Sequence, residues 1–293
     1  MTAIILWVLK GSIILSVFAI GLKASFRDVT YFFRWPGQLL RAFLAMGVIM
    51  PLFALTLILL FDLHPAVQIA LFAISVSPIP PIFPNKALKA GGRENYTIGL
   101  LVTSAATAVI VIPVAMEILE RIVGIPMQMR ARTVAAVVAT TIFLPLVVGI
   151  AVKTWAPKLA EKLVKPMALI ALVLLVLSAL PVLAGATGAM FSLIGDGTLL
   201  SISAFAVVGF VVGHLLGGPA HENRPTLALA SATRHPAVAL AIAHANFPNQ
   251  RLAMPAVLLY LMVVGVLSAV YMAWVKRHTV HDAAAETEHA VKA

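Results

Sequence analysis

The chain has 293 residues, of which 61% are hydrophobic and 11% are charged, and its formal net charge is +10. Soluble domains carry about 25% charged residues, so this composition predicts a polytopic membrane protein and argues against a soluble enzyme. The basic residues fall mostly in connections between apolar stretches, where they orient membrane spans, so we expect no nucleic-acid partner. The absence of cysteine excludes disulfides, thiolate metal sites and cysteine nucleophiles.

Nine apolar stretches follow one another along the chain. A helix needs about 20 residues to cross a bilayer, and each stretch is of that order. The stretches are residues 4–22, 38–61, 65–90, 96–118, 132–154, 166–185, 198–217, 225–247 and 251–275. They predict an all-α fold with nine transmembrane helices in one domain over residues 1–277, followed by a polar cytoplasmic tail over residues 278–293.

Prolines interrupt the third stretch. Proline lacks an amide proton and clashes with the preceding turn, so one continuous helix cannot contain four of them within seven residues. The four are Pro78, Pro80, Pro81 and Pro84. Asn85 and Lys86 follow directly. We therefore expect two half-helices joined by an extended segment.

The eighth stretch is interrupted at Thr233-Arg234-His235-Pro236. The break falls near the middle of the span, and charge at that depth is tolerated only against protein or a wet cavity. Interrupted segments at corresponding places in two halves of a chain point to the binding site of a transporter. The alternative interpretation is a pair of packed kinks, with Arg234 reaching to a membrane interface.

The order of the stretches and the charges predict a topology. The two broken stretches fit an inverted five-plus-five repeat that lacks its first helix, with halves of about 1–120 and 130–277. Basic residues concentrate in the connections on one side, which we expect to be cytoplasmic, so that the N-terminus lies outside and the C-terminus inside. That side holds Lys23, Arg27, Arg34, Lys86, Lys89, Arg93, Lys153, Lys158, Lys162, Lys165, Arg224, Lys276 and Arg277. The other side holds Arg121, Arg130, Arg132 and Arg251.

Three segments carry a resemblance to a known family. They are Gly21-Leu22-Lys23-Ala24-Ser25-Phe26-Arg27-Asp28, Ser77 to Asn85, and Ser231 to Ala239. In order and spacing they resemble the bile acid:sodium symporter family over nearly the whole chain. The resemblance implies core and panel domains, two discontinuous helices crossing behind a cavity, and sodium-coupled uptake of organic anions; nine-helix members lack the first span. We expect a protein of a bacterial inner membrane.

The family's sodium ligands are only partly present. The resemblance places Asn85 and Thr103 at ligand positions, whereas other ligand positions hold Pro84, Gly99, Ala230, Arg234 and His235. None of the eleven acidic residues lies deep in a stretch. Because hard cations prefer carboxylate and carbonyl oxygens, a sodium site here depends on hydroxyls, an amide and freed carbonyls. The candidate ion ligands are Asn85, Thr103, Thr107 and Ser231.

The second break has the chemistry of an anion site. Arg234 supplies a permanent positive charge, and a guanidinium matches carboxylate, phosphate or sulfonate with two hydrogen bonds. Lys86 is a second substrate-binding charge or a charge at the cytoplasmic end. Asn85 and Thr233 either orient the substrate or cap the broken backbone. His235, whose ordinary pKa is about 6.5, either carries a coupling proton or is a structural group.

These residues predict a secondary membrane transporter of a small organic anion, and no enzyme. The coupling ion is sodium by resemblance, and a proton or none by local chemistry. No cofactor other than Na⁺ as coupling ion is expected. The alternative is a membrane sensor or interaction protein that keeps the fold without transport. The expected partners are the anionic substrate and the lipid bilayer, and the sequence leaves the oligomeric state open.

Overall fold

The computed structural model describes residues 2–80, 82–123, 136 and 138–292. All the regular structure in these residues is helical, which confirms the predicted all-α class. Its first half contains α1 (Thr2–Gly21), α2 (Phe26–Val29), α3 (Tyr31–Arg34), α4 (Pro36–Phe43), the π-helix η1 (Leu44–Ile49), α5 (Met50–Leu60), α6 (Pro65–Val76), α7 (Phe83–Lys89) and α8 (Glu94–Val123). Its second half contains the π-helix η2 (Ala139–Phe143), α10 (Leu144–Trp155), α11 (Pro157–Phe191), α12 (Thr198–Leu216), α13 (Asn223–Ala232), α14 (Pro236–Asn246) and α15 (Ala253–Lys292).

Five helical segments are long and apolar enough to cross a membrane, and each coincides with a predicted stretch. They are Pro36–Leu60, Glu94–Ile122, Pro157–Phe191, Thr198–Leu216 and Ala253–Arg277. The other apolar helices are shorter: Lys10–Gly21, Pro65–Val76 and Ala139–Trp155. Residues 124–135, which include Arg130 and Arg132, lie outside the described part of the chain. The count of nine crossings therefore stays a prediction.

Both predicted breaks are present. α6 ends at Val76 before α7 begins at Phe83, and α13 ends at Ala232 before α14 begins at Pro236. An isolated proline does not have this effect, since Pro113 lies inside the continuous helix α8. Membrane helices tolerate a single proline where neighbouring groups bond the freed carbonyl. The breaks thus need a proline cluster, or a proline next to other helix-disfavouring residues.

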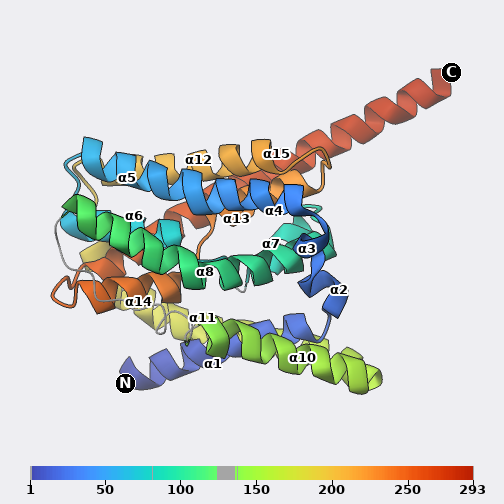
Figure 1. Ribbon diagram of the computed structural model, residues 1–293, viewed down its shortest axis with the longest axis horizontal. Helices are drawn as coiled ribbons and strands as arrows, with labels where there is room; N and C mark the ends of the chain where they lie inside the picture. Colours follow the sequence, from blue (N-terminus) through green and yellow to red (C-terminus); the bar gives the residue numbers. More distant parts are fainter. Residues whose placement is uncertain (1, 81, 124–135, 137, 293) are drawn as a thin grey trace.

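The helices pack in two groups. α1, α10 and α11 lie against one another along one side of the molecule, and α5 and α12 lie on the opposite side (Figure 1). Glycine allows α1 and α10 to approach each other closely, because a Cβ atom on Gly21 would lie 2.5 Å from the carbonyl oxygen of Leu146. Close backbone approach through small residues is the usual way in which membrane helices associate.

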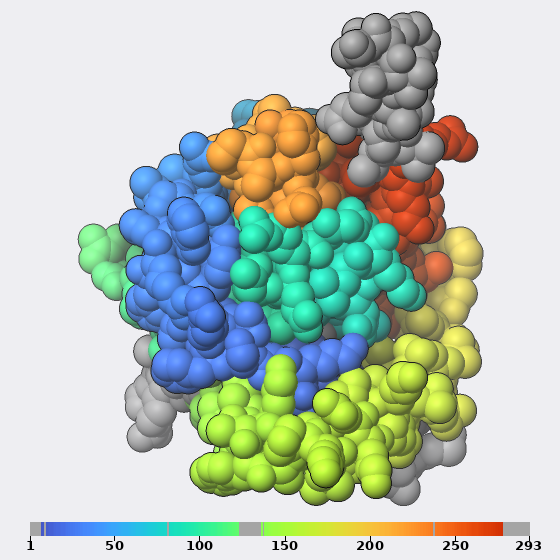
Figure 2. Space-filling view, turned by 90° about the vertical axis from the view of Figure 1, so that its right-hand side faces the viewer, coloured from blue at the N-terminus to red at the C-terminus, as the bar shows by residue number. Residues whose placement is uncertain are grey.

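Exposed basic side chains gather at one end of the bundle. Figure 2 looks onto this end, where α2, α3, α7 and the turn between α10 and α11 meet. Its exposed basic residues include Lys23, Arg27, Arg34, Lys89, Arg93, Lys158 and Lys162. Arg121 and Arg251 belong to the opposite end, where α8 ends and α15 begins (Figure 1). The described basic residues thus gather mainly at one end of the bundle, as the sequence predicts. The location of this end in the cytoplasm stays a prediction.

Candidate functional site

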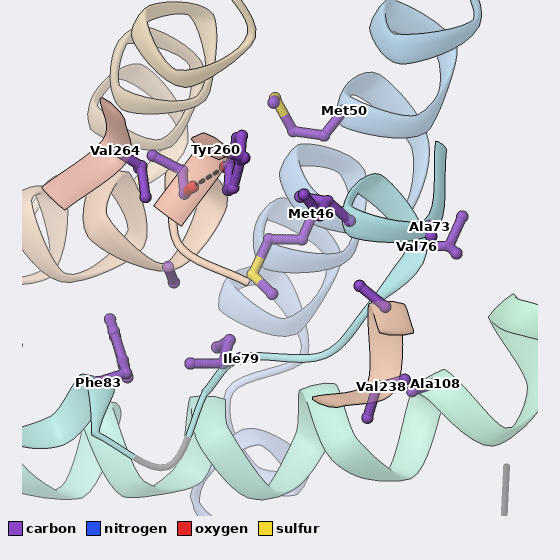
Figure 3. Packing of buried hydrophobic residues seen from close by; sticks show 14 of the residues in the cluster. Met46, Met50, Ala73, Val76, Ile79, Phe83, Ala108, Val238, Tyr260 and Val264 are labelled. Atoms are coloured by element: carbon purple, nitrogen blue, oxygen red, sulfur yellow. Dashed lines mark hydrogen bonds between the residues drawn. The ribbon is translucent and has the colours of Figure 1, made fainter. Parts of the chain in front are cut away.

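The two breaks cross in the interior of the molecule. The backbone N–H of His235 donates to the carbonyl oxygen of Pro78 over 2.8 Å, which joins one extended segment to the other. Figure 3 shows Ile79 on the first segment and Met46 and Tyr260 beside the second. Because lipid offers no hydrogen-bond donor, each carbonyl that a break frees needs a donor from elsewhere in the protein or from enclosed water.

The carbonyl of Met46 is freed by a π-helix and a proline together. In η1 the N–H of Met50 bonds Ala45, five residues before it. By the same spacing the donor for Met46 would be Pro51, which has no amide proton. Instead, Nη2 of Arg234 donates to the carbonyl oxygen of Met46 over 2.9 Å.

The carbonyl of Ser77 is freed by the proline cluster that follows it. Ser77 has an extended backbone at the end of α6, and Pro80, three residues later, has no N–H to offer. Nη1 of Arg234 donates to the Ser77 oxygen over 3.1 Å. One guanidinium therefore holds two carbonyls from separate parts of the chain. A guanidinium has five N–H donors, so three remain, and Nε has no partner within the described residues.

The carbonyl of Ala232 completes the crossing. Its helical donor would be the N–H of residue 236, which is a proline. The hydroxyl of Tyr260, from α15, donates to it instead (Figure 3). Next to it, the Thr233 hydroxyl donates to the carbonyl oxygen of Leu229 over 2.6 Å. The hydroxyl of Thr233 is thus bonded to its own helix, and its contact with a substrate stays a prediction.

Arg234 lines a small cavity of about 40 Å³. Its side chain is only 3% exposed. A water molecule needs about 10–15 Å³ measured in this way, so the cavity has room for a few waters or a small ion, and not for a large ligand. The polar residues that line it with Arg234 are Ser77, Thr103, Ser104 and Thr107, and the apolar ones include Phe32, Phe43, Met46 and Leu100. No acidic residue is among its lining residues.

α8 forms one wall of this cavity and bonds to the first break. The Ser104 hydroxyl accepts a hydrogen bond from the N–H of Ile79 over 3.3 Å and donates to the carbonyl oxygen of Leu101 over 3.0 Å. The Thr107 hydroxyl donates to the carbonyl oxygens of Thr103 and Ser104. The Ser104 hydroxyl thus joins α8 to the first break, whereas the Thr107 hydroxyl is bonded within α8.

A family model for the sodium bile acid symporter family matches residues 12–191, which is more than half of the chain. The chain belongs to this family. It is therefore a membrane transporter of the bile acid symporter type, and members of the family are transporters rather than enzymes. The match includes the first break and α8 and ends before the second break. No curated protein matches the chain.

The site residues predicted from the sequence are only partly brought together. Arg234, Thr103 and Thr107 line the same cavity. Asn85 is exposed on α7 and lines a different cavity, of about 50 Å³, with Lys23 and Glu94.

The remaining predicted site residues do not line the Arg234 cavity. Lys86 is half-buried on α7. Ser231 and His235 are buried, and neither the Ser231 hydroxyl nor either ring nitrogen of His235 has a hydrogen-bond partner within the described residues.

Three contributors to the crossing were missed by sequence reasoning. Met46 and Ser77 act through backbone oxygens, which have no signature in the side-chain letters, and Tyr260 belongs to a helix distant in sequence. A signal exists for Met46, since Pro51 removes the N–H that a π-helical turn would use. The choice of Arg234 and Tyr260 as donors depends on tertiary packing.

Proposed function

We propose that this symporter-family member is a secondary transporter of a small organic anion, which binds at the crossing of the two broken helices. The observation that carries the proposal is the buried guanidinium of Arg234, which lines a cavity without an acidic residue. A buried charge without a counter-charge is costly. An anion that enters the cavity supplies the missing negative charge.

The chemistry of the cavity favours an anion with an apolar body. Two of the five guanidinium N–H groups are bonded to backbone carbonyls, which leaves Nε and one N–H on each terminal nitrogen for a carboxylate, phosphate or sulfonate. The walls formed by Phe32, Phe43 and Leu100 suit a hydrocarbon portion. Pockets for drug-sized ligands are typically about 300–1,000 Å³, so the cavity of about 40 Å³ must widen to admit such a substrate.

We further propose that widening comes from motion between the two groups of helices. In this mechanism α1, α10 and α11 act as the panel domain and the helices around the breaks act as the core domain, and rocking of one against the other exposes the crossing to each side in turn. The basic end of the bundle lies in the cytoplasm, in a bacterial inner membrane. Asn85 and Lys86 are proposed to contact the substrate along its path, since both lie on α7 outside the cavity.

A membrane sensor on the same fold is the second candidate. The hydrogen bonds of Arg234, His235 and Tyr260 all tie the crossing together, and a crossing fixed in this way suits a protein that binds an anion without moving it. Stabilisation of the purified protein by an anion, without flux of that anion, would favour this role.

Uptake into proteoliposomes tests the proposal. A panel of radiolabelled carboxylates and sulfonates is offered to liposomes that hold the full chain, the Arg234→Ala variant or the Arg121→Ala variant. Arg121 is exposed and pairs with Glu117 on its own helix, so its loss controls for the removal of a positive charge. Uptake should be abolished in Arg234→Ala and retained in Arg121→Ala. Uptake of every transported anion by Arg234→Ala at the wild-type rate would refute the assigned site.

A further inference from the structure

We infer that Arg234 takes the place of a coupling sodium ion: its guanidinium occupies the carbonyl oxygens at the crossing, so this symporter-family member binds no sodium there. The inference rests on the proposed function and deepens it, because it concerns the ion that accompanies the anion. The sodium bile acid symporter family is named for this ion. A sodium site at the crossing would need free oxygen ligands and an environment without excess positive charge.

The carbonyls at the crossing already have donors. Hard cations such as calcium take six or more oxygen ligands, including backbone carbonyls. The oxygens of Met46 and Ser77 accept from Arg234, and the oxygens of Pro78 and Ala232 accept from His235 and Tyr260. Prolines remove the helical donors for three of these four, the oxygens of Met46, Ser77 and Ala232. A cation at the crossing would have to displace the guanidinium from two of them.

The side-chain candidates do not complete a cage in their place. Thr103 and Thr107 line the Arg234 cavity, whereas Asn85 lines a separate one and Ser231 lines neither. Within the described residues, no cluster of three or more histidine, cysteine or acidic side chains is placed to hold a metal ion. The side-chain oxygens that remain beside the guanidinium are therefore hydroxyls alone. They belong to Ser77, Thr103, Ser104 and Thr107.

The charge of the cavity also opposes sodium. Like charges repel strongly where water is scarce, and the repulsion is offset only by a nearby counter-charge. Arg234 is buried, and no aspartate or glutamate lines its cavity. The permanent positive charge of Arg234 would thus repel a sodium ion and attract an anion. The fixed charge stays with the protein through the cycle, so sodium does not have to arrive with each substrate.

Thermal unfolding of the purified full chain in detergent gives a test that needs no knowledge of the substrate. The unfolding temperature is measured in sodium chloride and in choline chloride at equal ionic strength. An ion that binds the folded state raises this temperature. Because sodium is not expected to bind, the wild type should unfold at the same temperature in both salts. A higher value in sodium for the wild type would overturn the inference.

Variants at position 234 sharpen the test. Arg234→Gln releases the oxygens of Met46 and Ser77, and it should become more stable in sodium than in choline; Arg251→Gln, the same change at an exposed position, should not. An Arg234→Gln protein that folds and shows no preference for sodium would also count against the inference. Should Arg234→Gln fail to fold, Arg234→Lys keeps a positive charge and is expected to show no response to sodium, so that a sodium response there would be contrary evidence.

Flux measurements separate this inference from the proposed function. Anion uptake into proteoliposomes should be equal in sodium and choline. Uptake that requires sodium would refute the replacement of sodium by Arg234 while supporting the proposed transport. Absence of flux for every anion in both salts would count against transport, whereas the unfolding temperatures would still decide whether the crossing binds sodium.

Discussion

Nη1 of Arg234 lies 3.1 Å from the carbonyl oxygen of Ser77, a residue 157 positions earlier in the chain. The same guanidinium reaches Met46, 188 positions earlier. The second break is therefore not only crossed by the first but bonded to it and to η1 by one side chain. Since these bonds replace helical ones that prolines remove, the breaks depend on one another, and loss of a donor at one of them leaves a carbonyl of its neighbour unpaired.

Tyr260→Phe should destabilise the crossing. Tyr260 is 1% exposed, and its hydroxyl is the donor to Ala232, whose helical donor is replaced by Pro236. A buried carbonyl left without a partner costs about 1–3 kcal/mol. We expect a lower unfolding temperature in detergent. Tyr271→Phe is the matched control, because its hydroxyl bonds the half-buried ring of His214 over 2.7 Å, where the loss should be smaller. Equal effects of the two changes would contradict the special role of Tyr260.

Gly213→Ala should disturb the packing of α12 on α13. A Cβ atom at this position would lie 2.4 Å from the carbonyl oxygen of Leu227 and 2.5 Å from the Cα atom of Ala228, so the helices must separate. Overpacking of this kind costs about 1–3 kcal/mol, and because α13 leads directly into Arg234, uptake should fall as well. The measurements are the unfolding temperature and anion uptake.

A second glycine provides the control for that substitution. A Cβ atom on Gly188 of α11 would meet nothing within 4 Å. Alanine is favoured over glycine in a helix by about 1 kcal/mol, so Gly188→Ala should be neutral or slightly stabilising. If Gly213→Ala were equally harmless, the close contact between α12 and α13 would be wrong.

The positions of the breaks could be predicted from sequence because proline acts locally. The cluster after Ser77, and Pro236 together with the charged and polar residues before it, disfavour a continuous helix locally, whereas the lone Pro113 does not interrupt α8. The bonding of the crossing could not, since it depends on which distant donors come near. Asn85 shows the limit clearly: adjacent in sequence to the first break, it is exposed on α7 and lines a different cavity from Arg234. Sequence distance along a half-helix does not determine which cavity a side chain faces.

The predicted orientation can be tested directly because the chain has no cysteine. Single cysteines are introduced at two exposed positions, Lys158→Cys at the basic end and Asn249→Cys at the opposite end. We expect a membrane-impermeant maleimide to label Asn249→Cys in intact cells and Lys158→Cys only after permeabilisation, since basic connections remain in the cytoplasm. The reverse pattern would invert the topology, and labelling of both from outside would contradict the separation of the two ends.

Proton coupling gives the last prediction. With sodium excluded from the crossing by Arg234, His235 is the side chain there whose ordinary pKa, about 6.5, lies near neutrality. Its backbone N–H is fixed to Pro78, and its ring nitrogens have no partner in the described part of the chain. The other ionisable side chains at the crossing are Arg234 and Tyr260. A protonated imidazole beside Arg234 is a second positive charge, which is favoured only while an anion is bound.

The proton should therefore enter together with the anion. Uptake is expected to rise as the external pH falls from about 8 to about 5.5, because acid favours the protonated imidazole that a bound anion stabilises. His235→Gln should flatten this profile, because an amide keeps the size and polarity of the side chain and does not titrate. His221→Gln, the same change at an exposed position, should leave the profile as in the wild type. A profile that survives His235→Gln would assign the pH dependence to the substrate or to another residue, and a wild-type profile that is flat in both sodium and choline would indicate a uniporter or an exchanger.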